Sequence, residues 1–79
     1  MIVKEALHFG KGDGLKNRIE EIRTARGIRQ EDFARLMGVS RQTISSLENG
    51  RYNPSILLAY KIARYFGMTI EEVFIFEEE

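Results

Sequence analysis

Apolar residues recur three and four positions apart along most of the chain, the spacing of residues on one face of an α-helix. The first such run predicts a helix from about Asp13 to Arg26, whose apolar face is formed by Leu15, Ile19 and Ile22. The same spacing returns in every later segment up to residue 74. We therefore expect a body built from helices.

Two short helices are predicted next, joined by a tight turn. The first runs from Gln30 to Met37, and Gly38 supplies the left-handed residue that ends it. Ser40 is placed to cap the following helix, which ends near Gly50. The turn is too short for the two helices to lie far apart, so they should pack as a unit spanning residues 30–49.

Two further helices complete the body. Residues 53–55 (Asn-Pro-Ser) start a helix with one apolar face that ends at Gly67. Thr69 and Glu72 have the spacing of a capping box, which predicts a short fifth helix around residues 70–74. The fold class is therefore all-α, with five helices in one domain of residues 15–74.

Both ends of the chain have strand-like segments outside the helical body. Residues 1–14 form an arm that ends in the glycine-rich connector GKGDG, and residues 75–79 form an acidic tail. One strand face of the arm carries Val3, Leu7 and Phe9, and one face of the tail segment carries Phe74 and Phe76. We expect short terminal strands that pair with each other, packed on the fifth helix or across a dimer axis, because an isolated two-stranded ribbon is marginal in water. A disordered arm is the alternative.

The charge distribution is uneven although the net charge is zero. Residues 14–66 contain ten Lys or Arg and five Asp or Glu, whereas the last nine residues contain five glutamates and no cation. The basic body favours a polyanionic partner such as nucleic acid, and the acidic tail would repel one.

The helix after Ser40 has an unusually polar face. Its two apolar residues, Ile44 and Leu47, point toward the body. At about 100° per residue, the opposite arc of roughly 140° holds Arg41, Gln42, Ser45, Ser46 and Asn49. Arginine suits hydrogen bonding to guanine and glutamine to adenine when a helix enters the major groove. An ordinary solvated helix face is the alternative, because short polar helices are common.

The segment from residue 30 to residue 49 resembles the helix-turn-helix of the lambda-repressor-like, Cro-type family, also called XRE. The resemblance rests on Gln30, Ala34, Gly38, Ile44 and Leu47, the last of which begins the sequence LENG, and it extends over about four-fifths of the chain. Ala34 is small where the two helices cross, and Gly38 permits the backbone angles of the turn.

The resemblance implies roles for individual residues. It places Arg41, Gln42 and Ser46 at base-reading positions with Ser45 beside them, and it places four residues near phosphates: Gln30, Thr43, Asn49 and Arg51. Gln30 should also brace Gln42 across the turn. Arg23 and Glu48 should form a structural pair that ties the first helix to the third. Arg29 stands where relatives often have a capping threonine, so the cap should be weaker and a phosphate contact becomes available.

The function that follows is a sequence-specific regulator of transcription, a repressor that binds a palindromic operator on double-stranded DNA as a homodimer in the cytoplasm. Candidate dimer residues lie on the arm, on the fourth helix and near the C-terminus: Val3, Leu7, Phe9, Leu57, Tyr60, Phe74 and Phe76. One alternative is an antitoxin-type protein that masks a toxin while regulating its own operon. Another is a binder of nucleic acid without sequence preference.

Catalysis, metals and cofactors find no support in the residues. The chain has no cysteine, which fits a reducing cytoplasm and excludes disulfides and thiolate metal sites. Its single histidine, His8, has no cysteine or carboxylate arrangement suited to a metal site or a nucleophilic triad. No apolar run approaches the length of a membrane span, so no membrane association is expected.

Overall fold

The computed structural model describes residues 15–51 and 53–76 of the 79-residue chain. Within this part, five helices are framed by two short strands. In chain order the elements are β1 (Lys16–Asn17), α1 (Ile19–Ala25), α2 (Gln30–Met37), α3 (Arg41–Glu48), α4 (Ile56–Phe66), α5 (Ile70–Val73) and β2 (Phe74–Ile75). The predicted class, a five-helix body with short terminal strands, is confirmed.

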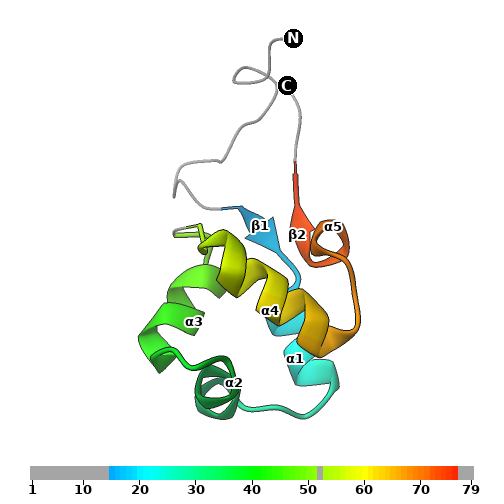
Figure 1. The fold of residues 1–79 in the computed structure, drawn as a ribbon. Helices are drawn as coiled ribbons and strands as arrows, with labels where there is room; N and C mark the ends of the chain where they lie inside the picture. The colour runs from blue at the N-terminus through cyan, green and yellow to red at the C-terminus, as the bar shows by residue number, and fades with distance from the viewer. Residues whose placement is uncertain (1–14, 52, 77–79) are drawn as a thin grey trace, which may run out of the picture.

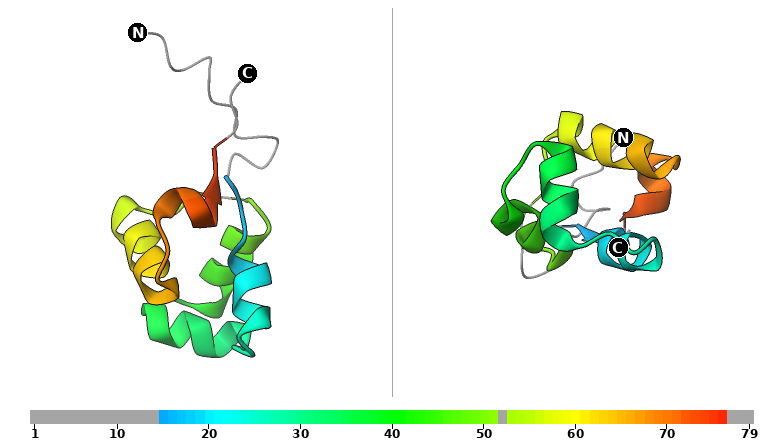
Figure 2. Two further views of the ribbon diagram at one scale, coloured as in Figure 1. Left: turned by 90° about the vertical axis from the view of Figure 1, so that its right-hand side faces the viewer. Right: turned by 90° about the horizontal axis from the view of Figure 1, so that it is seen from below.

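The helices surround one hydrophobic core, with the strand pair at one end of the molecule and α2 at the other (Figures 1 and 2). Every helix contributes at least one buried apolar side chain to this core. Its largest fully buried side chains are Phe33, Phe74, Ile19, Ile44, Leu47, Ile62 and Val73. Phe33 stacks on Phe66 with 5.2 Å between ring centroids, which joins α2 to α4.

The first helix begins later than the sequence pattern predicts. It starts at Ile19, whereas Lys16 and Asn17 are extended and belong to β1. The Asn17 side-chain oxygen accepts a hydrogen bond from the Ile19 amide at 3.1 Å, so Asn17 satisfies a free amide at the helix start. The predicted cap, Asp13, lies outside the described residues.

The C-terminal strand pairs with a partner that the sequence pattern did not indicate. β2 is antiparallel to β1, with Lys16 opposite Ile75 and Asn17 opposite Phe74. The predicted partner of β2 was the arm, which lies outside the described residues together with Val3, Leu7 and Phe9. Pairing with β1 places Phe74 against the core, where it is 1% exposed.

The other helix boundaries agree with the predicted capping chemistry. Gly38 ends α2 with φ = 75°, a left-handed conformation that suits glycine because it has no Cβ. Ser40 and Ser55 accept backbone hydrogen bonds at the starts of α3 and α4. Thr69 and Glu72 form the predicted capping box of α5.

Candidate nucleic-acid interface

The inner face of helix α3 is anchored in the hydrophobic core. Ile44 and Leu47 are fully buried in the core, and the Ser40 hydroxyl accepts a hydrogen bond from the Thr43 amide at 3.1 Å. At the turn before α3, the Val39 amide donates to the Ala34 carbonyl at 3.0 Å. A rigid support of this kind lets a helix present its outer face with a defined orientation.

The outer face of α3 carries the residues predicted to read bases. Arg41 and Gln42 are exposed, and Ser45 and Ser46 are half-buried on the same helix. A shallow hollow of about 170 Å³ is lined by Gln42, Thr43, Ser46 and Arg51. The structure thus brings two of the predicted reading residues, Gln42 and Ser46, next to Arg51, which is predicted to contact phosphate.

The N-terminus of α3 is favourable for a negatively charged partner. The first turns of α1, α2 and α5 each contain two acidic residues, whereas the first turns of α3 and α4 contain none, and α3 opens with Arg41. A helix N-terminus carries partial positive charge, which acidic side chains in the first turn would offset. No acidic side chain therefore offsets the partial positive charge at the exposed start of α3, and the guanidinium of Arg41 contributes a further positive charge there.

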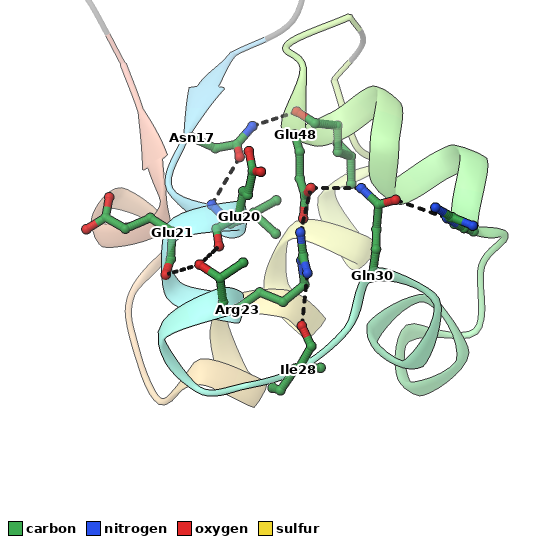
Figure 3. Close-up of polar contacts among 11 residues, drawn as sticks. Asn17, Glu20, Glu21, Arg23, Ile28, Gln30 and Glu48 are labelled. Carbon is green, nitrogen blue, oxygen red and sulfur yellow. Dashed lines mark hydrogen bonds and ion pairs between the residues drawn. The ribbon is translucent and has the colours of Figure 1, made fainter.

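The predicted pair of Arg23 and Glu48 is present and buried (Figure 3). Arg23 Nε donates to Glu48 Oε2 at 2.7 Å and Nη2 donates to Oε1 at 3.1 Å, while Nη1 donates to the Ile28 carbonyl at 2.9 Å. The two side chains are 8% and 3% exposed. This bidentate pair ties α1 to the C-terminal end of α3.

Gln30 has a different partner from the one predicted. Its Nε2 donates to Glu48 Oε1 at 3.0 Å, and its Oε1 accepts from Arg41 Nε at 3.1 Å. The amide therefore braces Arg41, and the prediction that it braces Gln42 is wrong. The physical reason is charge: the carboxylate of Glu48 accepts from the amide NH₂ group and the guanidinium of Arg41 donates to the amide oxygen, so the amide lies between two charged groups that fix its direction.

Arg29 provides no side-chain cap for α2. It stands at the N-cap of α2 but makes no side-chain hydrogen bond to a backbone amide of the first turn. Its Nε donates instead to the side chain of Asp32 in α2, at 3.1 Å from Oδ2. This hydrogen bond lowers the pKa of Asp32 and raises the pKa of Arg29. The pair is exposed to solvent, so it holds Arg29 in place at α2 without contributing much stability.

The two remaining candidates for phosphate contacts follow α3. Asn49 is the C-cap residue of α3 and is exposed. The Arg51 amide donates to the Ser46 carbonyl at 2.9 Å, which fixes its backbone beside the end of the helix. Both side chains are thus accessible from the face that presents Gln42 and Ser46.

Asn17 has a role that the sequence reasoning missed. Its Nδ2 donates to the Leu47 carbonyl at 2.7 Å, so β1 is bonded to the last turn of α3. The available signal was an asparagine two positions before a helical run, a typical residue for a helix start. Leu15 lies four residues before Ile19, so the apparent helical spacing extends across Asn17 and hides this signal.

An apolar surface lies away from the outer face of α3. A groove of about 650 Å³ runs between α4, α5 and β2, and its lining includes Leu15, Ile56, Tyr60, Met68, Phe74 and Phe76. Leu57, 71% exposed, Tyr60 and Phe76 are accessible, as a dimer contact requires. Phe74 also lines the groove, but it is 1% exposed and packs in the core. Its assignment as a dimer residue stays a prediction.

Comparison with known proteins places this geometry in a family. A helix-turn-helix family model matches residues 19–73. An HTH-type transcriptional regulator of Methanocaldococcus jannaschii is 48% identical over 65 residues, which is 82% of this chain and 98% of that protein. The regulator YgzD of Bacillus subtilis is 46% identical over 65 residues, again 82% of this chain and 98% of that protein.

Solved structures agree with the fold. The restriction-modification controller protein C.AhdI of Aeromonas hydrophila superposes with a TM-score of 0.62 at 34% identity, covering 70% of this chain and 80% of that one. A hypothetical transcription factor from Neisseria gives a TM-score of 0.62 at 27% identity, covering 70% and 63%. The chain belongs to the XRE-type, lambda-repressor-like helix-turn-helix family. It is a DNA-binding transcription regulator and not an enzyme.

Two observations on the described residues bear on other kinds of site. In residues 15–51 and 53–76, no three His, Cys, Asp or Glu side chains are grouped so that they could hold a metal ion. In the same ranges, no helix has the length and apolar character needed to cross a membrane.

Proposed function

We propose that the protein is a sequence-specific repressor that binds a palindromic operator as a homodimer through α3. The observation that carries the proposal is the outer face of α3. It presents Arg41 and Gln42 at a helix start without acidic residues, while Ile44 and Leu47 hold the opposite face in the core. Such a helix end fits the major groove, where guanidinium and amide side chains distinguish base edges.

The neighbouring side chains are proposed to have two roles, contact with bases and contact with phosphates. Gln42 and Ser46 share the hollow with Arg51, so contact of Arg51 with a phosphate would set the depth at which the other two meet the bases. Thr43, Asn49, Gln30 and Arg29 surround this face and complete the proposed contacts with the DNA backbone. Repression follows from occupancy, because a protein bound across a promoter excludes other proteins from the same DNA.

The proposed dimer uses the groove between α4, α5 and β2 and its exposed rim. Leu57, Tyr60 and Phe76 present apolar surface there, and burial of such surface favours self-association. A two-fold pair of subunits would place two α3 helices on half-sites about 34 Å apart, one turn of DNA. Val3, Leu7 and Phe9 of the arm are proposed to add to this contact.

Selection of bound sequences from random duplex DNA tests the proposal. Recovery of one palindromic sequence, with half-sites about ten base pairs apart, is the expected result. Recovery of unrelated sequences that all bind with the same salt dependence would contradict it and would favour a binder without sequence preference.

The same apolar rim supports a second candidate function. A surface that includes Ile56 and Leu57, both strongly exposed, could be covered by a different protein, as in an antitoxin that masks a toxin and regulates its own operon. A toxin-like reading frame beside the gene would favour this alternative. Sedimentation equilibrium separates the two: self-association of the purified protein supports the homodimer, whereas a stable monomer that pairs only with the neighbour's product supports the antitoxin.

A further inference from the structure

One side chain of α4 reaches the turn between α2 and α3. Lys61 Nζ donates a hydrogen bond to the Met37 carbonyl at 2.9 Å. Met37 is the last residue of α2, and Gly38 follows it with φ = 75°. A Cβ added to Gly38 would lie 3.6 Å from Nζ, so the amine lies directly beside the turn. Among the described residues, this is the only hydrogen bond between α4 and the segment 30–49.

The Met37 carbonyl is a suitable acceptor for an ammonium group. The last carbonyls of a helix have no amide partner within the helix. The Gly38 amide donates to the Arg35 carbonyl at 3.1 Å, and the Val39 amide donates to the Ala34 carbonyl at 3.0 Å. The amides of the turn therefore leave the Met37 carbonyl to the amine. The C-terminus of a helix also carries partial negative charge, so a cation at this carbonyl is favourable.

The opposite end of the helix-turn-helix is held by other elements. In the last turn of α3, Glu48 pairs with Arg23 of α1, and the Leu47 carbonyl accepts from Asn17 of β1. Apolar side chains such as Phe33 hold the unit against the core, but hydrophobic contact has no preferred direction. Without the bond from α4, the directed contacts would hold only the end of α3, and the unit could rotate about that end.

Helix α4 also carries part of the proposed dimer surface. Leu57, 71% exposed, lies one helical turn before Lys61, and Tyr60, 51% exposed, directly precedes it. One turn of an α-helix is only about 5.4 Å long. A second copy bound at this surface is thus connected to the turn between α2 and α3 by one short helical segment and one hydrogen bond. That connection decides where α3 lies relative to the two-fold axis.

We propose that Lys61 is a positioning residue: it fixes the angle between the helix-turn-helix and α4, and it thereby sets the half-site spacing that the dimer accepts. The inference deepens the proposed function and rests on the homodimer and the palindromic operator proposed above. Each base pair added between half-sites moves one of them by about 3.4 Å and turns it by about 35°. A rigid connection therefore rejects altered spacings, whereas a loose connection tolerates them.

The first experiment examines the bond in the free protein. We expect a scalar coupling in the NMR spectrum between Nζ of Lys61 and the carbonyl carbon of Met37, because such a coupling is transmitted only through a hydrogen bond. It is measured at low temperature and mildly acidic pH, where ammonium protons exchange slowly. Absence of the coupling in the wild-type protein would overturn the inference even if no variant folded.

The second experiment measures affinity for operators whose half-sites are moved apart or together by one and two base pairs. The wild type should prefer one spacing by about tenfold or more, since a misaligned half-site loses at least the contacts of one mismatched base pair. Lys61→Met keeps the apolar stem and removes the ammonium group. It should lower this preference by about threefold or more, since one hydrogen bond to a charged group is lost. Its affinity for a duplex with a single half-site should stay close to that of the wild type.

Arg26→Met is the matched control. Arg26 Nη2 donates to the Phe66 carbonyl at 2.8 Å, so this variant also removes a cationic donor from the end of a helix. The lost bond joins α1 to α4 and does not involve the helix-turn-helix. The control should therefore keep the spacing preference of the wild type. An equally weakened preference in both variants would show general loosening and would overturn the specific role of Lys61.

The operator series separates failure of the inference from failure of the proposed function. If Lys61→Met keeps the full spacing preference and loses affinity equally on all operators, the positioning role is overturned and the proposed dimer stands. If the wild type binds all spacings equally, the palindromic dimer is contradicted. The inference is then overturned with it, whether or not the coupling to the Met37 carbonyl is observed.

Discussion

Removing one partner of the buried ion pair between Arg23 and Glu48 should lower the free energy of unfolding far more than replacing both partners. Arg23→Met deletes a guanidinium that donates two hydrogen bonds to Glu48 and one to the Ile28 carbonyl. The carboxylate of Glu48 remains, 3% exposed, with Gln30 as its only remaining side-chain partner among the described residues. An uncompensated buried charge of this kind costs about 3–5 kcal/mol.

That cost is large for a domain of this size. A chain of 79 residues has a free energy of unfolding of about 4–12 kcal/mol by general per-residue values. The single variant should therefore lose at least a quarter of its stability, and its melting temperature should fall by about 12 °C or more. Replacing both partners, as in Arg23→Met with Glu48→Leu, removes the charges together and should restore stability to within about 1–2 kcal/mol of the wild type.

Urea unfolding followed by circular dichroism measures both variants, with Glu48→Leu alone completing the cycle. The expected result is a strong coupling between the two positions, with the double variant more stable than either single one. The reasoning is that both charges are buried and that each needs its partner. A decrease in the free energy of unfolding below about 1 kcal/mol in Arg23→Met, or additive decreases in the double variant, would refute it.

Three further predictions concern separate parts of the molecule. Phe74→Ala should lower the free energy of unfolding by about 3–5 kcal/mol, because it empties a core site; a denaturation midpoint close to that of the wild type would contradict its burial. Leu57→Glu should leave the melting temperature of the monomer unchanged and weaken self-association about tenfold or more; sedimentation equilibrium checks this, and an unchanged dimer would exclude the α4 rim from the interface. Arg51→Ala should weaken binding to all duplexes alike and reduce the salt slope by about one, because a phosphate contact releases counterions without reading a base; an altered sequence preference at constant slope would show that Arg51 reads bases.

Most of the helical framework could be predicted because its determinants are local. Gly38, Ser40 and the capping box of Thr69 and Glu72 act within a few residues of themselves, so the sequence shows them directly. The pair of Arg23 and Glu48 was expected only through the family resemblance, since 25 positions separate its members. Nothing in the local pattern indicates that contact.

The remaining features depend on tertiary structure. β1 consists of two residues, and it exists because its backbone pairs with Phe74 and Ile75 at the other end of the domain. This pairing also decides that Phe74 packs inward, which an alternating pattern of two residues could not show. The partner of Gln30 was mistaken for a similar reason, because the direction of an amide depends on the charged groups placed around it.

The central claim is that the outer face of α3 reads bases, and Arg41 is the residue that tests it most directly. Sequence selection from random duplex DNA should be run in parallel on the wild type and on Arg41→Ala. The account predicts that the variant keeps its fold, loses about 1–3 kcal/mol on the wild-type operator, and loses the preference for guanine at one symmetric base pair in each half-site. An identical selected sequence from both proteins, or affinity that falls equally on operator and random DNA, would contradict it.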